Sequence, residues 1–238
     1  MGEDTAAASR IRIRMLDSVA DAFEASAVLS AVWGGDRTGM PPNLVRALAH
    51  ADNYTAGVFD GDRMIGASVA FFGPPGERTM HSHITGILPE HRGLGLGRRI
   101  KAHQRTWALE HGVERITWTF DPLVARNAHF NLAVLGARAV DYLENHYGAM
   151  DDGVNRADES DRLLVEWSLL RPAPIAPRAD EAAATVPVPD DIETLRARHP
   201  AEAARWRRAL RQDLSGPMRA GMRIAGFDPR AGYLLVHA

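Results

Sequence analysis

A glycine-rich turn between an apolar run and a helical pattern constrains this chain most. Residues 91–99 read His-Arg-Gly-Leu-Gly-Leu-Gly-Arg-Arg, after the apolar run 84–88 and before a helical pattern that reaches about His111. The first backbone N–H groups of a helix have no partner inside it, and the helix dipole adds partial positive charge there. Glycines let the backbone approach an anion without an intervening Cβ. We therefore expect a pyrophosphate on residues 92–98.

The spacing of the glycines narrows the class of phosphate ligand. The loop G-x-x-x-x-G-K-[ST] is excluded, because no Lys-Ser or Lys-Thr follows. The dinucleotide pattern G-x-G-x-x-G is excluded as well, since the glycines stand at positions 93, 95 and 97. The pattern that fits is Arg-x-x-Gly-x-Gly, at Arg92, Gly95 and Gly97. A glycine turn without a ligand is the alternative.

This pattern resembles the acyl-CoA-binding motif of the GNAT superfamily of N-acetyltransferases. The resemblance implies that the turn holds the pyrophosphate of coenzyme A, with acetyl-CoA or another acyl-CoA as cosubstrate. The binding residues that it implies in the turn are Arg92, Gly93, Leu94, Gly95, Leu96, Gly97 and Arg98. It also implies that the preceding strand lines the pantetheine arm, which places Ile87 and Leu88 beside that arm.

Hydrophobic periodicity predicts a mixed α/β fold. Strands are expected at 10–15, 54–59, 63–72, 78–88, 115–120, 137–143 and 163–169. Helices are expected from Asp17 or Ser18, after Pro41-Pro42, after the glycine turn and over 125–135. The sheet is then largely antiparallel, with a central β-α-β unit that binds acyl-CoA. This order matches that of GNAT proteins over residues 10–169.

Composition divides the chain into three parts. Residues 1–170 form the GNAT-like acyl-CoA-binding domain, residues 171–189 a linker rich in proline and alanine, and residues 190–238 a C-terminal extension of helix and hairpin. One helical face of the extension carries Ala203, Trp206, Leu210, Leu214 and Met218. We expect this stripe, anchored by Trp206, to dock on its own domain or on a second subunit in a homodimer.

Composition also excludes several classes of protein. A net charge of −2 and the lack of a basic stripe argue against a nucleic-acid partner. The chain has no cysteine, which excludes disulfides and thiolate catalysis, and we expect no metal. No apolar run approaches the length of a membrane span, and the acidic N-terminus is unlike a signal peptide. We expect a cytoplasmic protein without a membrane partner.

The resemblance also bears on the segment after the strand at 115–120. It implies that Asn127 and Phe130 contact coenzyme A. The tyrosine that often protonates the departing thiolate in the family falls at Leu132, and leucine cannot donate a proton. Tyr147 and Tyr142 are the nearest substitute acids in the sequence. Tyr147 is the candidate acid, and an ordinary surface tyrosine is the alternative.

Two histidines on the strand before the turn suggest a general base. His81 and His83 are two residues apart, so strand alternation puts both on one face, together with Ile87. His83 is the candidate base for the acceptor amine, and a structural or substrate-lining role is the alternative. Thr85 is a candidate for substrate binding on the same face. Two histidines without a third ligand make a weak metal site.

Acidic residues bear on the nature of the acceptor. Asp121 follows the strand that ends at Phe120, where ligands of open α/β sheets gather. It is a candidate for binding a cationic amine or acting as a base, and a turn-forming role is equally open. Residues 144–162 are rich in acidic groups, and an acidic loop at the acceptor site favours a cationic acceptor. A solvated loop, with Asp161 and Arg162 as a structural pair, is the alternative.

Together these residues predict an enzyme that moves an acetyl group from acetyl-CoA to a small-molecule amine. The chain further resembles a group of predicted GNAT proteins of unassigned substrate, through residues 127–131, 147–150 and 160–162. One alternative is a non-catalytic acyl-CoA-binding or regulatory protein, which the leucine at position 132 favours. Another is a different reaction of acyl-CoA, such as hydrolysis or decarboxylation, on the same scaffold.

Overall fold

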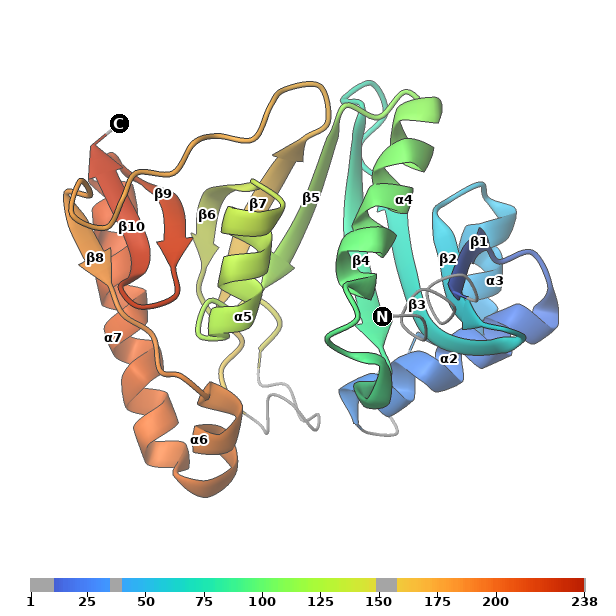
Figure 1. Ribbon diagram of the computed structural model, residues 1–238, viewed down its shortest axis with the longest axis horizontal. Coiled ribbons are helices and arrows are strands. Elements are labelled where there is room, and N and C mark those ends of the chain that lie inside the picture. The colour runs from blue at the N-terminus through green and yellow to red at the C-terminus, as the bar shows by residue number, and fades with distance from the viewer. Residues whose placement is uncertain (1–10, 35–39, 149–157, 238) are drawn as a thin grey trace, which may run out of the picture. The chain divides into compact units, whose positions relative to one another are not determined.

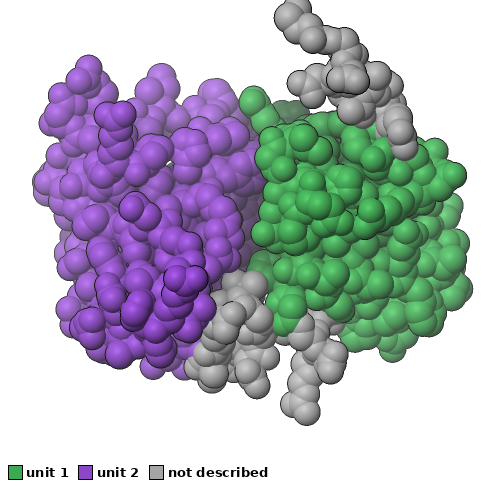
Figure 2. Space-filling view, turned by 60° about the horizontal axis from the view of Figure 1, so that its bottom comes forward, with its two compact units in different colours: residues 1–116 green, residues 117–238 purple. Residues whose placement is uncertain are grey.

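The computed structural model describes residues 11–34, 40–148 and 158–237. Contacts between residues divide the chain into two compact units, residues 1–116 and 117–238, which Figure 2 colours separately. We describe each unit by itself. The domain boundaries expected at residues 170 and 189 remain predictions.

Unit 1 is an antiparallel meander with helices before and after it (Figure 1). Its elements are β1 (Ile11–Met15), α2 (Val19–Trp33), α3 (Pro42–His50), β2 (Thr55–Asp60), β3 (Arg63–Phe72), β4 (Thr79–Ile87), η1 (Pro89–His91) and α4 (Leu96–Glu110). Strands β1 to β4 pair antiparallel in chain order, β1 with β2, β2 with β3 and β3 with β4. The predicted mixed, largely antiparallel fold is confirmed.

The first helix of unit 1 begins with a complete capping box. The Ser18 hydroxyl accepts a hydrogen bond from the backbone N–H of Asp21 at 3.0 Å. The Asp21 carboxylate in turn accepts from the N–H of Ser18 and from both Nη atoms of Arg14 on β1. These hydrogen bonds, the one from Arg14 above all, hold the pKa of Asp21 well below its usual range despite partial burial. The start of α2 is therefore tied to the strand before it.

The described part of unit 2 contains a group of three strands, a separate three-stranded sheet, three α-helices and a π-helical turn (Figure 1). Its elements are β5 (Arg115–Phe120, which begins just before the division), α5 (Ala125–Ala128), the π-helical turn η2 (His129–Val134), β6 (Arg138–Leu143), β7 (Arg162–Ser168), β8 (Ala184–Val186), α6 (Ile192–Arg198), α7 (Pro200–Arg219), β9 (Met222–Asp228) and β10 (Gly232–His237). Strand β7 lies between β5 and β6, and β10 lies between β8 and β9. The expected hairpin near the C-terminus is β9–β10.

The segment expected as a linker is more ordered than its composition indicates. Residues Ala184–Val186 form β8, which pairs with β10 through Val186 and Tyr233. Upstream, a Cβ added at Gly136 would overlap Ala173, and one added at Gly226 would overlap Ala176. The segment therefore packs against the unit that it crosses. The prolines of this segment exclude a helix but allow an extended strand.

Charged side chains, rather than Trp206, anchor the long helix α7. Ala203, Leu210 and Leu214 are buried as expected, but Trp206 is only half-buried. Arg207 is 2% exposed, and its guanidinium binds the Asp158 carboxylate through Nε at 3.0 Å and through Nη2. The choice of Trp206 as anchor is therefore wrong. Helical spacing allows either position 206 or 207 to follow Ala203 inward, and the partly buried Asp158 carboxylate selects the arginine.

Truncation of these two neighbours should separate their roles. Arg207→Ala removes one of two cations from the partly buried Asp158 carboxylate, and breaking a buried ion pair typically costs about 3–5 kcal/mol. Trp206→Ala should cost less, because the indole is partly exposed in the folded protein. Urea unfolding of both variants measures the difference. A larger loss of stability for Trp206→Ala would contradict this assignment.

Candidate functional site

The glycine turn of unit 1 leaves the first backbone donors of α4 without side-chain partners. Gly93 and Gly95 have positive φ of 82° and 70°, and a Cβ added at either would meet no atom within 4 Å. Backbone conformation, rather than lack of space for a side chain, therefore favours glycine at these two positions. Gly95 is the N-cap of α4 with no capping side chain, and the first turn of the helix carries no acidic residue. The donors at this end are available to an anion.

The turn also presents arginines and is fixed in place by its apolar residues. Arg92, Leu94 and Arg98 are exposed together with the two glycines. Leu96 is buried in the core, as is Leu88, and the Leu88 N–H donates to the Ile65 carbonyl at 2.9 Å. Open backbone donors, two exposed arginines and a first helical turn without acidic residues suit a diphosphate. The predicted turn residues therefore fit the phosphate end of coenzyme A.

Strand β4 contains a bulge at His83. Val69 of β3 pairs with Ile84, but Ala70 pairs with Ser82, which leaves His83 as the extra residue. Such a bulge breaks the strict alternation of side chains along a strand. The predicted alternation of side chains between the two faces of this strand therefore does not continue across His83.

The bulge separates two sets of predicted site residues. Ser82 accepts a hydrogen bond from Lys101 of α4, and beyond the bulge Thr85 shares that face, since its hydroxyl bonds Ser68 at 2.8 Å. The His83 ring lies 5.8 Å from that of Phe71, on the other face, where a Cβ at Gly86 would meet Val32 of α2. The expectation that Thr85 and Ile87 share a face with His83 is wrong, because the bulge shifts the alternation.

His83 has the properties of a neutral imidazole. Its ring is exposed on one side and packs near Phe71 and His81, with ring centroids 5.8 and 6.4 Å away. Partial burial lowers the pKa of His83 below its ordinary value of 6.5. It is therefore unprotonated at neutral pH and able to accept a proton. Within the described ranges, no three His, Asp or Glu side chains cluster as metal ligands would.

In unit 2, Tyr147 is a half-exposed side chain. The residue is 46% exposed, and its hydroxyl lies 3.1 Å from the Thr119 hydroxyl on β5. The Arg162 guanidinium lies over its ring at 5.5 Å, and the His146 ring packs edge-on at 4.5 Å. Sequence reasoning did not identify Thr119. The only signal was the alternation of threonines with apolar residues along β5.

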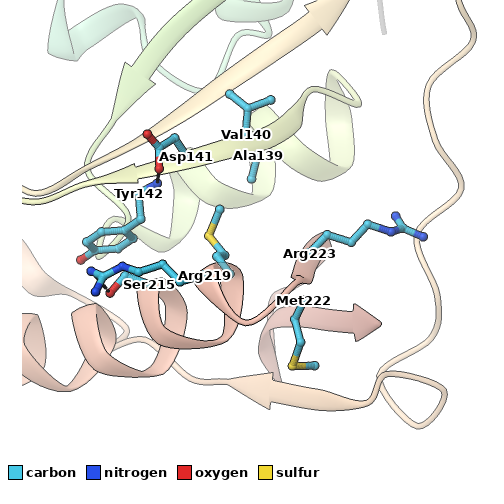
Figure 3. A pocket seen from close by; sticks show the side chains of 9 residues that line it. Ala139, Val140, Asp141, Tyr142, Ser215, Arg219, Met222 and Arg223 are labelled. Carbon is cyan, nitrogen blue, oxygen red and sulfur yellow. Dashed lines mark hydrogen bonds between the residues drawn. The ribbon is translucent and has the colours of Figure 1, made fainter. Parts of the chain in front are cut away.

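The other tyrosine considered as an acid, Tyr142, is buried. Its hydroxyl donates to Asp161 at 2.7 Å, and burial together with this hydrogen bond raises the pKa of Tyr142 far above its ordinary value. It lines a pocket of about 300 Å³ between β6 and the end of α7 (Figure 3). Apart from Tyr142, none of the residues considered for the site lines this pocket. Its other lining residues are Ala139, Val140, Asp141, Ser215, Met218, Arg219, Met222 and Arg223.

Asp121 has protein partners for both carboxylate oxygens. Oδ1 accepts from the Leu123 N–H at 3.0 Å, and Oδ2 binds the buried Arg196 of α6 at 2.5 Å. The turn-forming alternative accounts for this residue, and we leave it out of the proposed acceptor site. The same pairing removes the argument for a cationic acceptor. Among the described residues of the acidic segment, Glu144, Asp158, Glu159 and Asp161 all pair with arginines of α6 or α7. Residues 149–157 lie outside the described residues.

The segment after β5 is helical, as expected, but only its first part is a regular α-helix. Helix α5 continues into the π-helical turn η2, and such turns are frequent at functional sites. Asn127 and Phe130 are half-buried, whereas Leu132 is 6% exposed and packs inward. Asn131 accepts a hydrogen bond from Trp118 Nε1 at 3.1 Å. The roles of Asn127 and Phe130 toward coenzyme A stay predictions.

Comparison with known proteins agrees with this geometry. Residues 21–134 match the acetyltransferase (GNAT) family model. The Escherichia coli ribosomal-protein-S18-alanine N-acetyltransferase has a similar fold, with a TM-score of 0.55 and 12% identity over 68% of this chain and 96% of its own. A putative Salmonella typhimurium acetyltransferase, solved with its cofactor acetyl-CoA, has a TM-score of 0.54 and 20% identity over 71% and 99%.

A third solved structure is the Vibrio fischeri ribosomal-protein-S5-alanine acetyltransferase. It has a TM-score of 0.54 and 17% identity over 68% of this chain and 96% of its own. These likenesses confirm the expected GNAT fold. The curated proteins give no match to this sequence. Among the described helices, none combines the length and the apolar character that crossing a membrane requires.

A carboxylate at the start of α4 should weaken coenzyme A binding without harming the helix. Gly97→Asp places negative charge beside the open donors, where it favours the helix but repels a diphosphate. Loss of one charge-assisted hydrogen bond costs about 1.5–3 kcal/mol, so calorimetry should show at least roughly tenfold weaker binding. Gly97→Asn is the uncharged control of the same size. Equal affinity of the two variants would show that charge at the turn does not matter.

The one lysine of the chain should make stability depend on pH. Lys101 is buried, donates to Ser82 and Gln104, and burial lowers its pKa to about 7 from an ordinary 10.5. Between these values the unfolded chain holds more protons, so stability should rise with pH from 7 to about 10. Lys101→Met should flatten that rise in urea unfolding measured across this range. An unchanged slope in the variant would contradict this interpretation.

Proposed function

This chain carries a GNAT acetyltransferase domain over residues 21–134, the domain of acyl-CoA-dependent N-acetyltransferases, and we propose that it acetylates the amine of a small molecule. The observation that carries the proposal is the open N-terminus of α4 behind two positive-φ glycines. Acetyl-CoA supplies the activated acyl group. The choice of acetyl over longer acyl groups, and the cytoplasmic location, stay predictions.

The residues of unit 1 divide between holding the cosubstrate and handling a proton. The turn from Arg92 to Arg98 is proposed to bind the pyrophosphate, and Ile87 and Leu88 to contact the pantetheine arm. An amine attacks only in its neutral form and must lose a proton as the amide forms. His83, unprotonated at neutral pH, is proposed to accept that proton.

Release of coenzyme A as a thiol needs a second proton. Leu132 stands where the family often has a tyrosine, and its side chain is apolar and buried. We assign the role of acid to Tyr147, since it is a half-exposed phenol whose hydroxyl hydrogen-bonds with that of Thr119. A free thiol has a pKa near 8.5, so protonation lowers the cost of its departure at neutral pH.

The competing function is that of a non-catalytic acyl-CoA-binding protein, and the buried Leu132 favours it. Incubation with acetyl-CoA and a broad panel of amines, read by thiol release, separates the two. The panel should contain small-molecule amines and peptides with an N-terminal alanine, because two of the similar structures are ribosomal-protein-alanine acetyltransferases. Tight coenzyme A binding with no thiol release from any amine would support the binding protein.

Substitution of the two proton-handling residues tests the mechanism. A general acid or base contributes about 10²–10⁴ in rate, so Tyr147→Phe and His83→Gln should each lower kcat by such a factor, with coenzyme A affinity unchanged. His111→Gln, an exposed histidine at the end of α4, is the control. Full turnover in Tyr147→Phe would exclude the tyrosine as the acid. A decline of wild-type activity at acidic pH that disappears in His83→Gln would support the base.

A further inference from the structure

The turn that carries Tyr147 is built around two fully buried side chains, Ser160 and Asp161. The Tyr147 N–H donates to the Ser160 hydroxyl at 2.7 Å, and the His146 N–H donates to the Ser160 carbonyl at 3.0 Å. The Asn145 N–H donates to Asp161 Oδ1 at 3.0 Å, and the Asn145 side chain accepts from the Ser160 N–H. Asn145 has a positive φ of 45°, a conformation that these bonds maintain.

Asp161 depends on Arg211 of α7 for compensation of its charge. Its carboxylate is 0% exposed and accepts four hydrogen bonds. Arg211 supplies two of them, from Nη2 to Oδ1 at 2.6 Å and from Nε to Oδ2 at 2.9 Å. The other two come from the Asn145 N–H and the Tyr142 hydroxyl. Burial alone would raise the pKa of Asp161, but these bonds, led by that of Arg211, keep it below the ordinary value.

A buried carboxylate that loses its cation must protonate or move. Either change weakens the acceptor for the Asn145 N–H and so releases the start of the turn. Of the hydrogen bonds that fix the turn, those to Ser160 would remain, and the Tyr147 side chain would keep its contacts with Thr119, Arg162 and His146. Proton transfer is sensitive to misplacement of about an ångström.

We propose that Arg211 is a positioning residue, through which the C-terminal extension holds the turn of Tyr147 by clamping Asp161. The role of that turn in catalysis rests on the proposed function, whereas the clamp itself does not. Without this link the extension would contribute only to stability. With it, the extension contributes to the geometry of the candidate acid.

Amide hydrogen exchange tests the clamp without reference to catalysis. Arg211→Gln should accelerate exchange at the Asn145 and Tyr147 amides at least roughly tenfold, because their acceptors become mobile. Arg208→Gln, on the same helix but exposed, is the matched control and should leave both amides unchanged. Arg211→Lys keeps the charge and lacks the bidentate fork, so it should fold and show intermediate exchange. Wild-type protection in both Arg211 variants would overturn the proposal.

A double-mutant cycle then connects the clamp to turnover. Arg211→Lys should lower kcat by roughly tenfold with the KM for acetyl-CoA unchanged, and should have no further effect in a Tyr147→Phe background. An equal loss in both backgrounds would show that Arg211 acts by another route and would overturn the positioning role. Full kcat in Tyr147→Phe alone would reject the tyrosine as acid, while the exchange experiment would still decide the clamp.

Discussion

The functional account depends on a backbone constraint at the start of α4. Gly93 and Gly95 adopt a left-handed conformation that costs other residues roughly 1–2 kcal/mol. This conformation turns the chain sharply out of β4 and into the helix, so that the first N–H groups of α4 are not covered by a capping side chain. An anion is the natural partner for such groups. The buried leucines on either side, Leu88 and Leu96, fix the turn to the core.

Unit 2 is held by a different kind of interaction. Arginines of α6 and α7 enter the unit and neutralise Asp121, Asp158 and Asp161, which lie at or near the ends of strands. Such pairs contribute little net stability. Removal of one partner is costly, however, because it leaves the other charge buried without compensation. The extension is thereby tied to the segment that carries Tyr147. A stretch that reads as an appendage in the sequence is thus part of the structure around the candidate acid.

Much of the fold follows from local patterns in the sequence. Alternation and turn residues predict most strands and the main helices to within a few residues, and the glycine pattern predicts the turn that precedes α4. The bulge at His83 was not predictable, because it depends on pairing with β3 and leaves no mark in the composition. The choice of Arg207 over Trp206 depends on Asp158, which is 49 residues away in the chain. Strand β8 depends on pairing with β10, which is distant in the sequence.

The central claim is that the open donors of the glycine turn bind the diphosphate of coenzyme A. Titration of isotope-labelled protein with coenzyme A, followed by amide NMR, tests this claim most directly. The account predicts that the amides of Gly95, Leu96 and Gly97 shift strongly with coenzyme A and hardly at all with pantetheine, which lacks the diphosphate. Saturable binding of coenzyme A that leaves these three amides unshifted would contradict it.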